Sequence, residues 1–339
     1  MYGVLHENYY KEQGIMTYDE FLSYVKEGME DILGENYIVR IHKVLKNNDV
    51  ELDALTVLSK DSNVSPTIYL NPYYEEYKSG VRREEILRDI YQLYDGHSRK
   101  INFNVDVFRD FELIREKIAF KLINTDANKK LLKDVPNVPF MDLSMVFYCI
   151  LDDENFGNAT ALIHNVHMDM WGITLEKLTN YAKINTPRLL QYELKDINDV
   201  IKEMLVENLN ETVMESDLRY DENCGKFDAN VVAEGMLNNI SDLKSAIAMY
   251  VLTNKQKNNG AACMVYENVM AEFAKKVNSD VYIIPSSVHE VILVPAVEGI
   301  EKSELTEMVK EVNQAELDKI DVLSDHVYLY SKEEDKFSM

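Results

Sequence analysis

The segment 282–295, YIIPSSVHEVILVP, contains Ser286, Ser287, His289 and Glu290 between two apolar runs. A serine becomes a nucleophile when a histidine within hydrogen-bonding distance takes its proton and a third group orients that histidine. The chain has no G-x-S-x-G elbow, and this turn has no glycine that could expose an oxyanion-binding amide. We therefore interpret the four residues as a structural turn whose hydroxyls bond to nearby backbone amides. A hydrolase centred on Ser287 and His289 stays open as an alternative.

Two histidines, His164 and His167, stand three residues apart in IHNVHMD and could be read as a metal-binding pair. Residues 159–170 are predicted as a strand, in which successive side chains alternate between faces. The two imidazoles would then lie on opposite faces and could not bind one ion. His167 and Asp169 would share a face, but two ligands do not make a site. We predict no metal site, and no cofactor, because P-loop, G-x-G-x-x-G and kinase motifs are absent.

The tyrosines of IYLNPYYEEYKSG could stack on the bases of a single nucleic-acid strand. Glu75 and Glu76 lie among them, however, and no basic groove accompanies them. We therefore predict that these tyrosines pack in the core or between helices.

Helices and hairpins at regular intervals must position these residues. A capping box, Thr17 with Glu20, begins a helix that ends at Gly34. Thr174 and Ser303 are predicted to cap two later helices. By apolar periodicity, strands are predicted at 37–45, 50–58, 67–70, 118–124, 142–151, 159–170, 246–254, 281–285, 291–295 and 326–331, and helices at 17–33, 83–95, 106–117, 128–135, 174–182, 196–209, 261–277 and 303–317.

This pattern predicts an α+β fold with two or three small, hairpin-rich, mostly antiparallel sheets, each covered by helices. The order strand, helix, strand, strand, helix occurs twice, which suggests internal duplication of a β-α-β-β-α unit. We predict an N-terminal α-β-β-β-α block at 1–100 and a middle α+β unit at 101–190. A helical or irregular connector at 191–245 and a C-terminal β-α-β-β-α-β unit at 246–339 would follow.

The charge of the chain is strongly negative: 36 Lys and Arg stand against 59 Asp and Glu, a net charge of −23. Such a chain repels phosphate backbones and anionic lipids, so we predict no direct nucleic-acid binding and no membrane binding. An acidic surface could instead occupy the basic groove of a nucleic-acid-binding protein.

The cysteines and the N-terminus bear on the compartment. Cys149, Cys224 and Cys263 have no C-x-x-C spacing, which favours a reducing compartment. No signal peptide and no membrane-spanning apolar run is present. We therefore expect a cytoplasmic protein.

Several segments, among them KNNDVELDALTVL, NVSPTIYLNPYYEEYKSG and DVYIIPSSVHEVILVP, resemble an uncharacterised bacterial family, domain of unknown function 5688. The resemblance runs from about Thr17 to Tyr330 and implies an origin in gut bacteria. It implies no activity. Besides the serine and histidine turn, it matches a set of polar and aromatic positions that we take as candidate binding residues: Asn47, Asn48, Asn63, Tyr69, Asn71, Tyr73 and Tyr74.

The sequence therefore predicts a cytoplasmic, non-enzymatic protein that acts by binding another macromolecule, with a protein as its partner. One alternative is an acidic inhibitor that imitates nucleic acid and acts on a nucleic-acid-binding effector. The other is the hydrolase described above.

Overall fold

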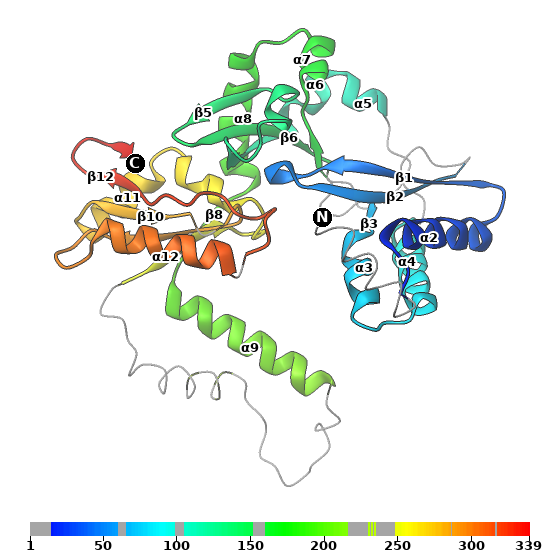
Figure 1. Cartoon of the computed structure of the whole chain (residues 1–339). Coiled ribbons are helices and arrows are strands. Elements are labelled where there is room, and N and C mark those ends of the chain that lie inside the picture. The colour runs from blue at the N-terminus through cyan, green and yellow to red at the C-terminus, as the bar shows by residue number, and fades with distance from the viewer. Residues whose placement is uncertain are drawn as a thin grey trace, which may run out of the picture. The chain divides into compact units, whose positions relative to one another are not determined.

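The computed structural model describes residues 15–59, 66–98, 105–151, 160–215, 230, 232, 234, 248–285, 287–315 and 317–339. The chain forms two compact units (Figure 1). Unit 1 comprises Met1–Ile114 with Ile150–Ala161, and unit 2 comprises Arg115–Cys149 with Leu162–Met339. Three mostly antiparallel sheets with helices confirm the predicted α+β class. The four-part division of the chain stays a prediction.

Unit 1 contains a three-stranded sheet and several helices. Its strands β1 (Tyr37–Leu45), β2 (Glu51–Ser59) and β3 (Ile68–Tyr69) are antiparallel neighbours in that order, as predicted. The predicted capping box is confirmed at the start of α2 (Tyr18–Leu33), where the Thr17 and Glu20 side chains each accept the other's backbone N–H. The remaining helices are α3 (Asn71–Lys78), α4 (Arg83–Ser98), α5 (Val105–Arg109) and α6 (Phe111–Ile114).

One face of this sheet carries the core of unit 1. Val39 lies opposite Val57 in the ladder, and both pack with Phe21, Val25 and other apolar side chains of the helices. Because side chains alternate along a strand, Arg40 and its cross-strand neighbour lie on the other face.

Unit 2 contains most of a smaller sheet built from β4 (Ile118–Asn124), β5 (Asn137–Phe140), β6 (Leu143–Ile150) and β7 (Thr160–Leu162), of which Ile150, Thr160 and Ala161 are counted with unit 1. Its order is β4-β6-β5, and β7 also pairs with β6. Helix α7 (Asn165–Trp171) follows β7, and α8 (Leu175–Leu189) lies against β4. The predicted cap of α8 is confirmed, because the Thr174 hydroxyl accepts the Lys177 N–H at 3.2 Å.

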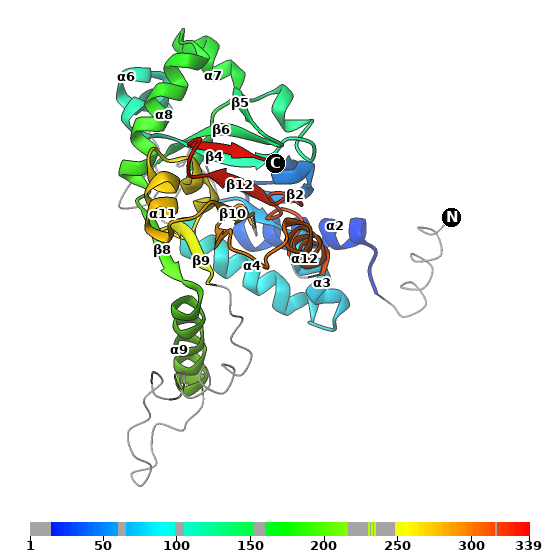
Figure 2. The ribbon, with the colours of Figure 1, turned by 90° about the vertical axis from the view of Figure 1, so that its left-hand side faces the viewer.

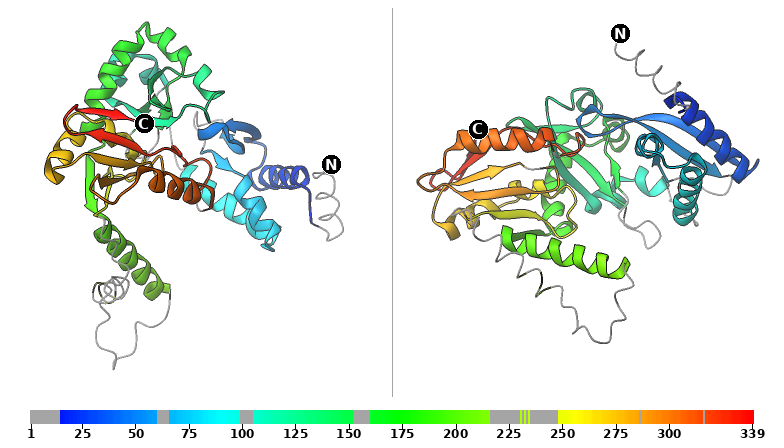
Figure 3. Two further views of the ribbon diagram at one scale, coloured as in Figure 1. Left: turned by 60° about the vertical axis from the view of Figure 1, so that its left-hand side comes forward. Right: turned by 60° about the horizontal axis from the view of Figure 1, so that its bottom comes forward.

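The larger sheet of unit 2 has six strands in the order β13-β12-β10-β11-β9-β8. Helix α12 (Lys302–Ala315) lies along it (Figure 1) and is seen nearly end-on in Figure 2; its Leu305 and Val309 pack on Ile284 and Val294. Helix α9 (Ile197–Glu215) leads away from the end of β8 (Figure 3, left). The strands are β8 (Tyr192–Asp196), β9 (Tyr250–Asn254), β10 (Val281–Ile284), β11 (Val291–Pro295), β12 (Tyr328–Ser331) and β13 (Lys336–Ser338), and α11 (Val269–Val277) precedes β10.

The two sheets of unit 2 share a strand order. In β4-β6-β5 and in β9-β11-β10 the first strand pairs with the third, and the third pairs with the second. All these pairings are antiparallel. The predicted repeat of a strand, helix, strand, strand, helix unit stays a prediction, because its first copy counted a helix at 128–135 and a strand at 159–170, where the structure has a 3-10 helix, Leu131–Lys133, and β7.

Several sequence-based boundaries are wrong. The helix predicted at 106–117 is divided into α5, α6 and a 3-10 helix, Arg115–Lys117, and the helix predicted at 128–135 is only a 3-10 helix, Leu131–Lys133. The strand predicted at 159–170 ends at Leu162 and gives way to α7; the alternation of Val166, Met168 and Met170 with polar residues belongs to a short exposed helix. The helix predicted at 261–277 is a 3-10 helix, Gly260–Val265, followed by α11, because Asn268 adopts a left-handed conformation (φ 66°) between them. Ser303 lies inside the first turn of α12. None of the described helices combines the length and apolar content needed to cross a bilayer.

Candidate functional site

The serine and histidine turn joins β10 to β11, and local hydrogen bonds hold its serine. Ser287 is buried, with 3% of its surface exposed. Its hydroxyl donates to Glu290 Oε1 at 2.7 Å and accepts the backbone N–H of His289 at 3.0 Å. Ser286 lies outside the described residues. The hydroxyl is therefore engaged with a carboxylate and an amide of its own turn.

The His289 ring is held from two sides by segments that are distant in sequence. Its Nδ1 accepts the backbone N–H of Asn259 at 3.3 Å, which assigns the ring proton to Nε2. Nε2 then donates to Asp321 Oδ1 at 3.3 Å. The His289 carbonyl accepts the Thr253 hydroxyl at 2.7 Å. The imidazole thus joins three loops at one end of the six-stranded sheet.

This geometry lacks the contact on which serine nucleophiles depend. A triad needs the serine hydroxyl to donate to an imidazole nitrogen. Both His289 nitrogens have other partners, and Ser287 donates to Glu290. The arrangement, among the residues that the structure describes, ties loops together and does not activate a hydroxyl.

Gly260 shows how closely these loops approach. A Cβ atom at this position would lie 2.2 Å from Thr253 Oγ1 and 2.4 Å from the His289 carbonyl oxygen. Real Cβ atoms do not come so close to other atoms. The turn at 287–290 therefore rests directly on the backbone of the 3-10 helix that begins with Gly260.

The candidate binding residues of unit 1 lie partly at the β1–β2 turn. Asn47 and Asn48 belong to a single 3-10 turn, in which Asn48 has the left-handed angle φ 58°. Lys46 donates from Nζ to the Tyr69 hydroxyl at 2.9 Å and lies 4.5 Å from the centre of that ring. The structure therefore brings Tyr69 to the turn. Asn63 lies outside the described residues.

The other candidates hold α3 against the rest of unit 1. Asn71 Oδ1 accepts the Asp53 N–H at 2.8 Å, which fixes the start of α3 to β2. The Tyr74 hydroxyl donates to the Met16 carbonyl at 3.0 Å, and its ring contacts Tyr18 and Phe21. Tyr73 also packs against the core of unit 1, and burial raises its pKa. These contacts give the tyrosines the packing role predicted for them.

The histidine pair needs a correction, because its residues lie on a helix end and not on a strand. His164 is the N-cap of α7, and its backbone N–H donates to His167 Nδ1 at 3.0 Å. His164 Nδ1 lies 2.7 Å from Asp134 Oδ2. The two rings are near neighbours, with centroids 5.6 Å apart. The pair therefore shares one side and caps α7.

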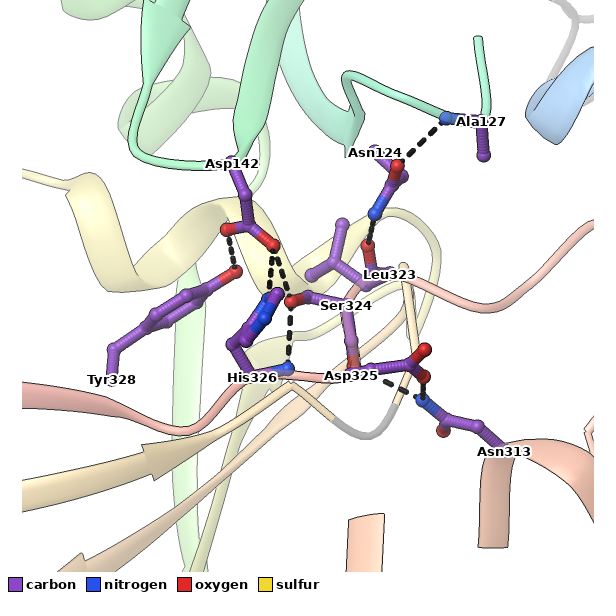
Figure 4. A network of polar contacts seen from close by, with 9 residues as sticks. All are labelled: Asn124, Ala127, Asp142, Asn313, Leu323, Ser324, Asp325, His326 and Tyr328. Atoms are coloured by element: carbon purple, nitrogen blue, oxygen red, sulfur yellow. Dashed lines mark hydrogen bonds and ion pairs between the residues drawn. The ribbon is translucent and has the colours of Figure 1, made fainter. Parts of the chain in front are cut away.

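A second set of serine, histidine and aspartate side chains was not predicted from the sequence. Asp142, in the tight turn between β5 and β6, lies among side chains that precede or begin β12 (Figure 4). Its Oδ2 accepts the Ser324 hydroxyl at 2.6 Å and faces His326 Nδ1 at 3.1 Å, and its Oδ1 accepts the Tyr328 hydroxyl at 2.7 Å. Ser324 does not contact an imidazole nitrogen, since its Oγ accepts the His326 backbone N–H.

We call the contacts of Asp142 with Ser324, His326 and Tyr328 the Asp142 clamp. The clamp joins the two sheets of unit 2. Nearby, the Asn124 side chain donates to the Leu323 carbonyl at 3.0 Å, and Asn313 donates to the Ser324 carbonyl at 3.0 Å. Asp142 and Tyr328 stand 186 positions apart, and Asn124 and Leu323 stand 199 positions apart. The one sequence signal is Ser-Asp-His at 324–326, directly before a predicted strand.

The described thiols and acids do not form a reactive or metal-binding centre. Burial raises the pKa of Cys149 to about 11 and that of Cys263 to about 12, so both thiols stay protonated. Cys224 lies outside the described residues. No group of three or more His, Cys, Asp or Glu side chains in the described part of the chain is arranged to hold a metal ion.

Helix α9 differs from the other long helices because it buries none of its described side chains. Its apolar residues Ile197, Ile201, Leu205 and Leu209 follow one another every fourth position, and the sequence continues this series at Val213. Ile201 is 38% exposed, and Met204 beside it is 57% exposed. We call this row the apolar ribbon.

The acids of α9 form a second row on the opposite side. Asp199, Glu203 and Glu207 also recur every fourth position, and the sequence continues this series at Glu211 and Glu215. Four residues turn the helix by about 400°, so each member of a row is displaced by about 40° from the one before it. Each acid follows a member of the apolar ribbon by two residues, about 200°, which places the two rows on opposite sides of the helix. Lys195 bonds to Glu203 at 2.8 Å, and Lys202 pairs with Glu234.

Comparison with known proteins gives one family and no characterised relative. A family model described as a family of unknown function (DUF5688) matches residues 18–332. No curated protein and no solved structure matches the chain. The match confirms the resemblance seen in the sequence and brings no activity with it.

Proposed function

Since the chain belongs to the DUF5688 family, whose function is unknown, we infer its role from its own surfaces. We propose that it binds a basic protein partner through α9 and catalyses no reaction. The apolar ribbon of α9, exposed at Ile201 and half-buried at Ile197, Leu205 and Leu209, carries this proposal together with the exposed Met204 beside it. A cytoplasmic location is part of it, supported by the spacing of the cysteines.

Helix stability argues that α9 needs a packing partner. Most helices in proteins are stabilised by the packing of one apolar face, because intrinsic propensity alone is weak. Helices α2, α8 and α12 all bury apolar side chains, among them Val25, Leu178 and Val309. In α9, Ile201 and Met204 remain exposed. A partner that covers the apolar ribbon would supply the burial that the other helices already have.

The acid row indicates the charge of that partner. Like charges four residues apart destabilise a helix by about 0.2–0.5 kcal/mol per pair. The acid row repeats this arrangement from Asp199 to Glu215, and of its described members Glu203 is paired with Lys195. A partner that covers the apolar ribbon lies across the helix from the acid row, about 10 Å away, so a basic partner surface would be attracted at longer range and would associate faster.

Affinity purification from a lysate of the native host tests the proposal. The bait is the full chain, as wild type, as an α9 variant (Ile201→Ser with Met204→Ser) and as an α12 control (Met308→Ser with Val312→Ser). The control removes a pair with similar exposure, 42% and 40%, from another helix. We expect basic proteins to be recovered with wild type and control, and to fall at least about tenfold with the α9 variant. Equal recovery with all three baits would contradict the proposal.

A second candidate function is the imitation of nucleic acid, supported by the regular spacing of the acid row. Four residues of helix rise by about 6 Å, so the row carries one charge per 6 Å. A strand of duplex DNA carries one per roughly 3.4 Å. The lower charge density makes this the weaker candidate, because fewer charges per length reach a basic groove.

Competition with DNA separates the two functions. A partner recovered as above is bound to labelled duplex DNA, and the chain is added at increasing salt. Imitation predicts displacement of DNA that weakens steeply with ionic strength. It also predicts loss of displacement on Asp199→Asn, Glu203→Gln and Glu207→Gln combined, and none on neutralising Glu304, Glu307 and Glu311 of α12. Binding of the partner without displacement would leave only the first function.

A further inference from the structure

Strand β1 forms an edge of the unit 1 sheet and is nine residues long. Residues 38–44 make no hydrogen bonds with the rest of the described chain other than those of the ladder with β2. An edge strand exposes a row of N–H and C=O groups that can pair with another strand. The free edge of β1 is therefore a template for strand addition.

The edge strand β4 of unit 2 shows how this chain closes an edge. The Phe120 N–H donates to Thr186 Oγ1 at 3.0 Å, and the Ile118 carbonyl accepts Asn185 Nδ2 at 3.1 Å. Two polar side chains of α8 thus satisfy the outer groups of β4. No such side chains lie along β1 in the described part of unit 1.

The side chains of β1 indicate what it would bind. Arg40 and His42 are both exposed on the face opposite the core, and Ile38 on the same face is 54% exposed. Neither Arg40 nor His42 forms an ion pair with the described residues. Together with Lys26 of α2 they line a hollow of about 460 Å³ that also includes Thr56 and Leu58. A basic strip is unusual in a chain of net charge −23.

We propose that β1 binds an extended acidic segment of another protein by strand addition. Alternate residues of a strand lie about 7 Å apart on one face. A segment with an apolar residue opposite Ile38 and carboxylates opposite Arg40 and His42 would match the strip. Backbone pairing would provide affinity, and the opposite charges would select the partner.

This site is independent of α9, which lies in the other unit and calls for a basic partner. The proposal also differs from an alternative in which the charges of β1 only prevent association at this edge. Charged residues on edge strands often prevent association. A protective role predicts that no peptide binds at all, whereas strand addition predicts selective binding with backbone pairing.

Peptide binding to the full chain tests the proposal. The probe is a labelled, end-capped peptide of sequence TIVEVEVT, and its counterpart TIVKVKVT replaces both acids. Fluorescence anisotropy measures affinity, and hydrogen exchange measures protection of the β1 amides. We expect the acidic peptide to bind at least about tenfold more tightly and to slow exchange along β1. Arg40→Glu should reverse the preference, whereas Arg82→Glu, a matched exposed arginine on unit 1, should leave it unchanged.

Three results would overturn the proposal. The first is binding of neither peptide or of both equally. The second is binding without protection of the β1 amides. The third is a self-associated wild type, seen by sedimentation, that Arg40→Glu dissociates, because this would assign the edge to a second copy of the chain.

Discussion

At the scale of single residues, Gly260 decides whether the turn at 287–290 can rest on its neighbours. We expect Gly260→Ala to lower the free energy of unfolding by about 1–3 kcal/mol or more, because the new Cβ would meet the His289 carbonyl and the Thr253 hydroxyl. Gly96→Ala is the matched control. It lies exposed in α4 with no atom within 4 Å of its Cβ position, so we expect it to stabilise by about 0.5–1 kcal/mol. Urea unfolding measures both, and two changes of the same sign would contradict the close approach.

His167 provides a pH-dependent prediction at the same scale. Burial, and then the neighbouring His164, lower its pKa below the usual 6.5, so the folded protein holds the ring neutral. The unfolded chain therefore takes up the proton first. The stabilisation is complete above about pH 6.5 and is lost as the pH falls below it. We expect wild type to lose more unfolding free energy between about pH 7.5 and pH 5.5 than His167→Gln. Parallel pH profiles in urea titrations would show that the ring contributes nothing.

Local hydrogen bonds were predictable at this scale, and distant partners were not. Ser287 and Glu290 stand three residues apart, so a bond within the turn follows from the sequence pattern. The partners of His289 are different, because Asn259 and Asp321 lie 30 and 32 positions away. Only the pairing of the strands brings those loops to one end of the sheet.

At the scale of elements, strong apolar periodicity and capping residues identified the long helices and the central strands. Short strands at sheet edges were not predicted. The strands β5, β8 and β13 have few buried residues, so apolar and polar residues hardly alternate along their sequences. Helix α3 was not predicted either, since its tyrosines pack without forming a fully buried stripe. The helix predicted at 196–209 corresponds to α9, and its apolar periodicity did not indicate that its described side chains stay half-buried or exposed.

The Asp142 clamp allows a prediction about how elements hold together. Asp142→Ala would leave the buried hydroxyls of Ser324 and Tyr328 without their acceptor. We expect a loss of about 2–4 kcal/mol in the free energy of unfolding, because each orphaned buried polar group is costly. Asp126→Ala removes a carboxylate that is 87% exposed and should change it by less than about 0.5 kcal/mol. Equal effects of the two substitutions would show that the clamp does not stabilise unit 2.

At the scale of the whole molecule, the division into two units could not be read from the sequence. Unit 1 includes Ile150–Ala161, a segment separated in sequence from the rest of the unit by Arg115–Cys149 of unit 2, which contains β4, β5 and most of β6. Composition and turn residues mark local breaks in the chain, and they do not report which distant segments pack together. The same limit applies to the Asp142 clamp, whose residues meet only in the folded protein.

Matched core substitutions test whether the units are separate folding units. Leu55 and Leu293 are both fully buried, the first in unit 1 and the second in unit 2. Truncation of a buried leucine to alanine costs about 2.7–5 kcal/mol. Compact units with their own cores can unfold in separate transitions. We therefore expect calorimetry to resolve two transitions, with Leu55→Ala lowering the midpoint of one and Leu293→Ala that of the other, each by on the order of 10 °C. A single transition that both substitutions shift together would show that the two units unfold as one.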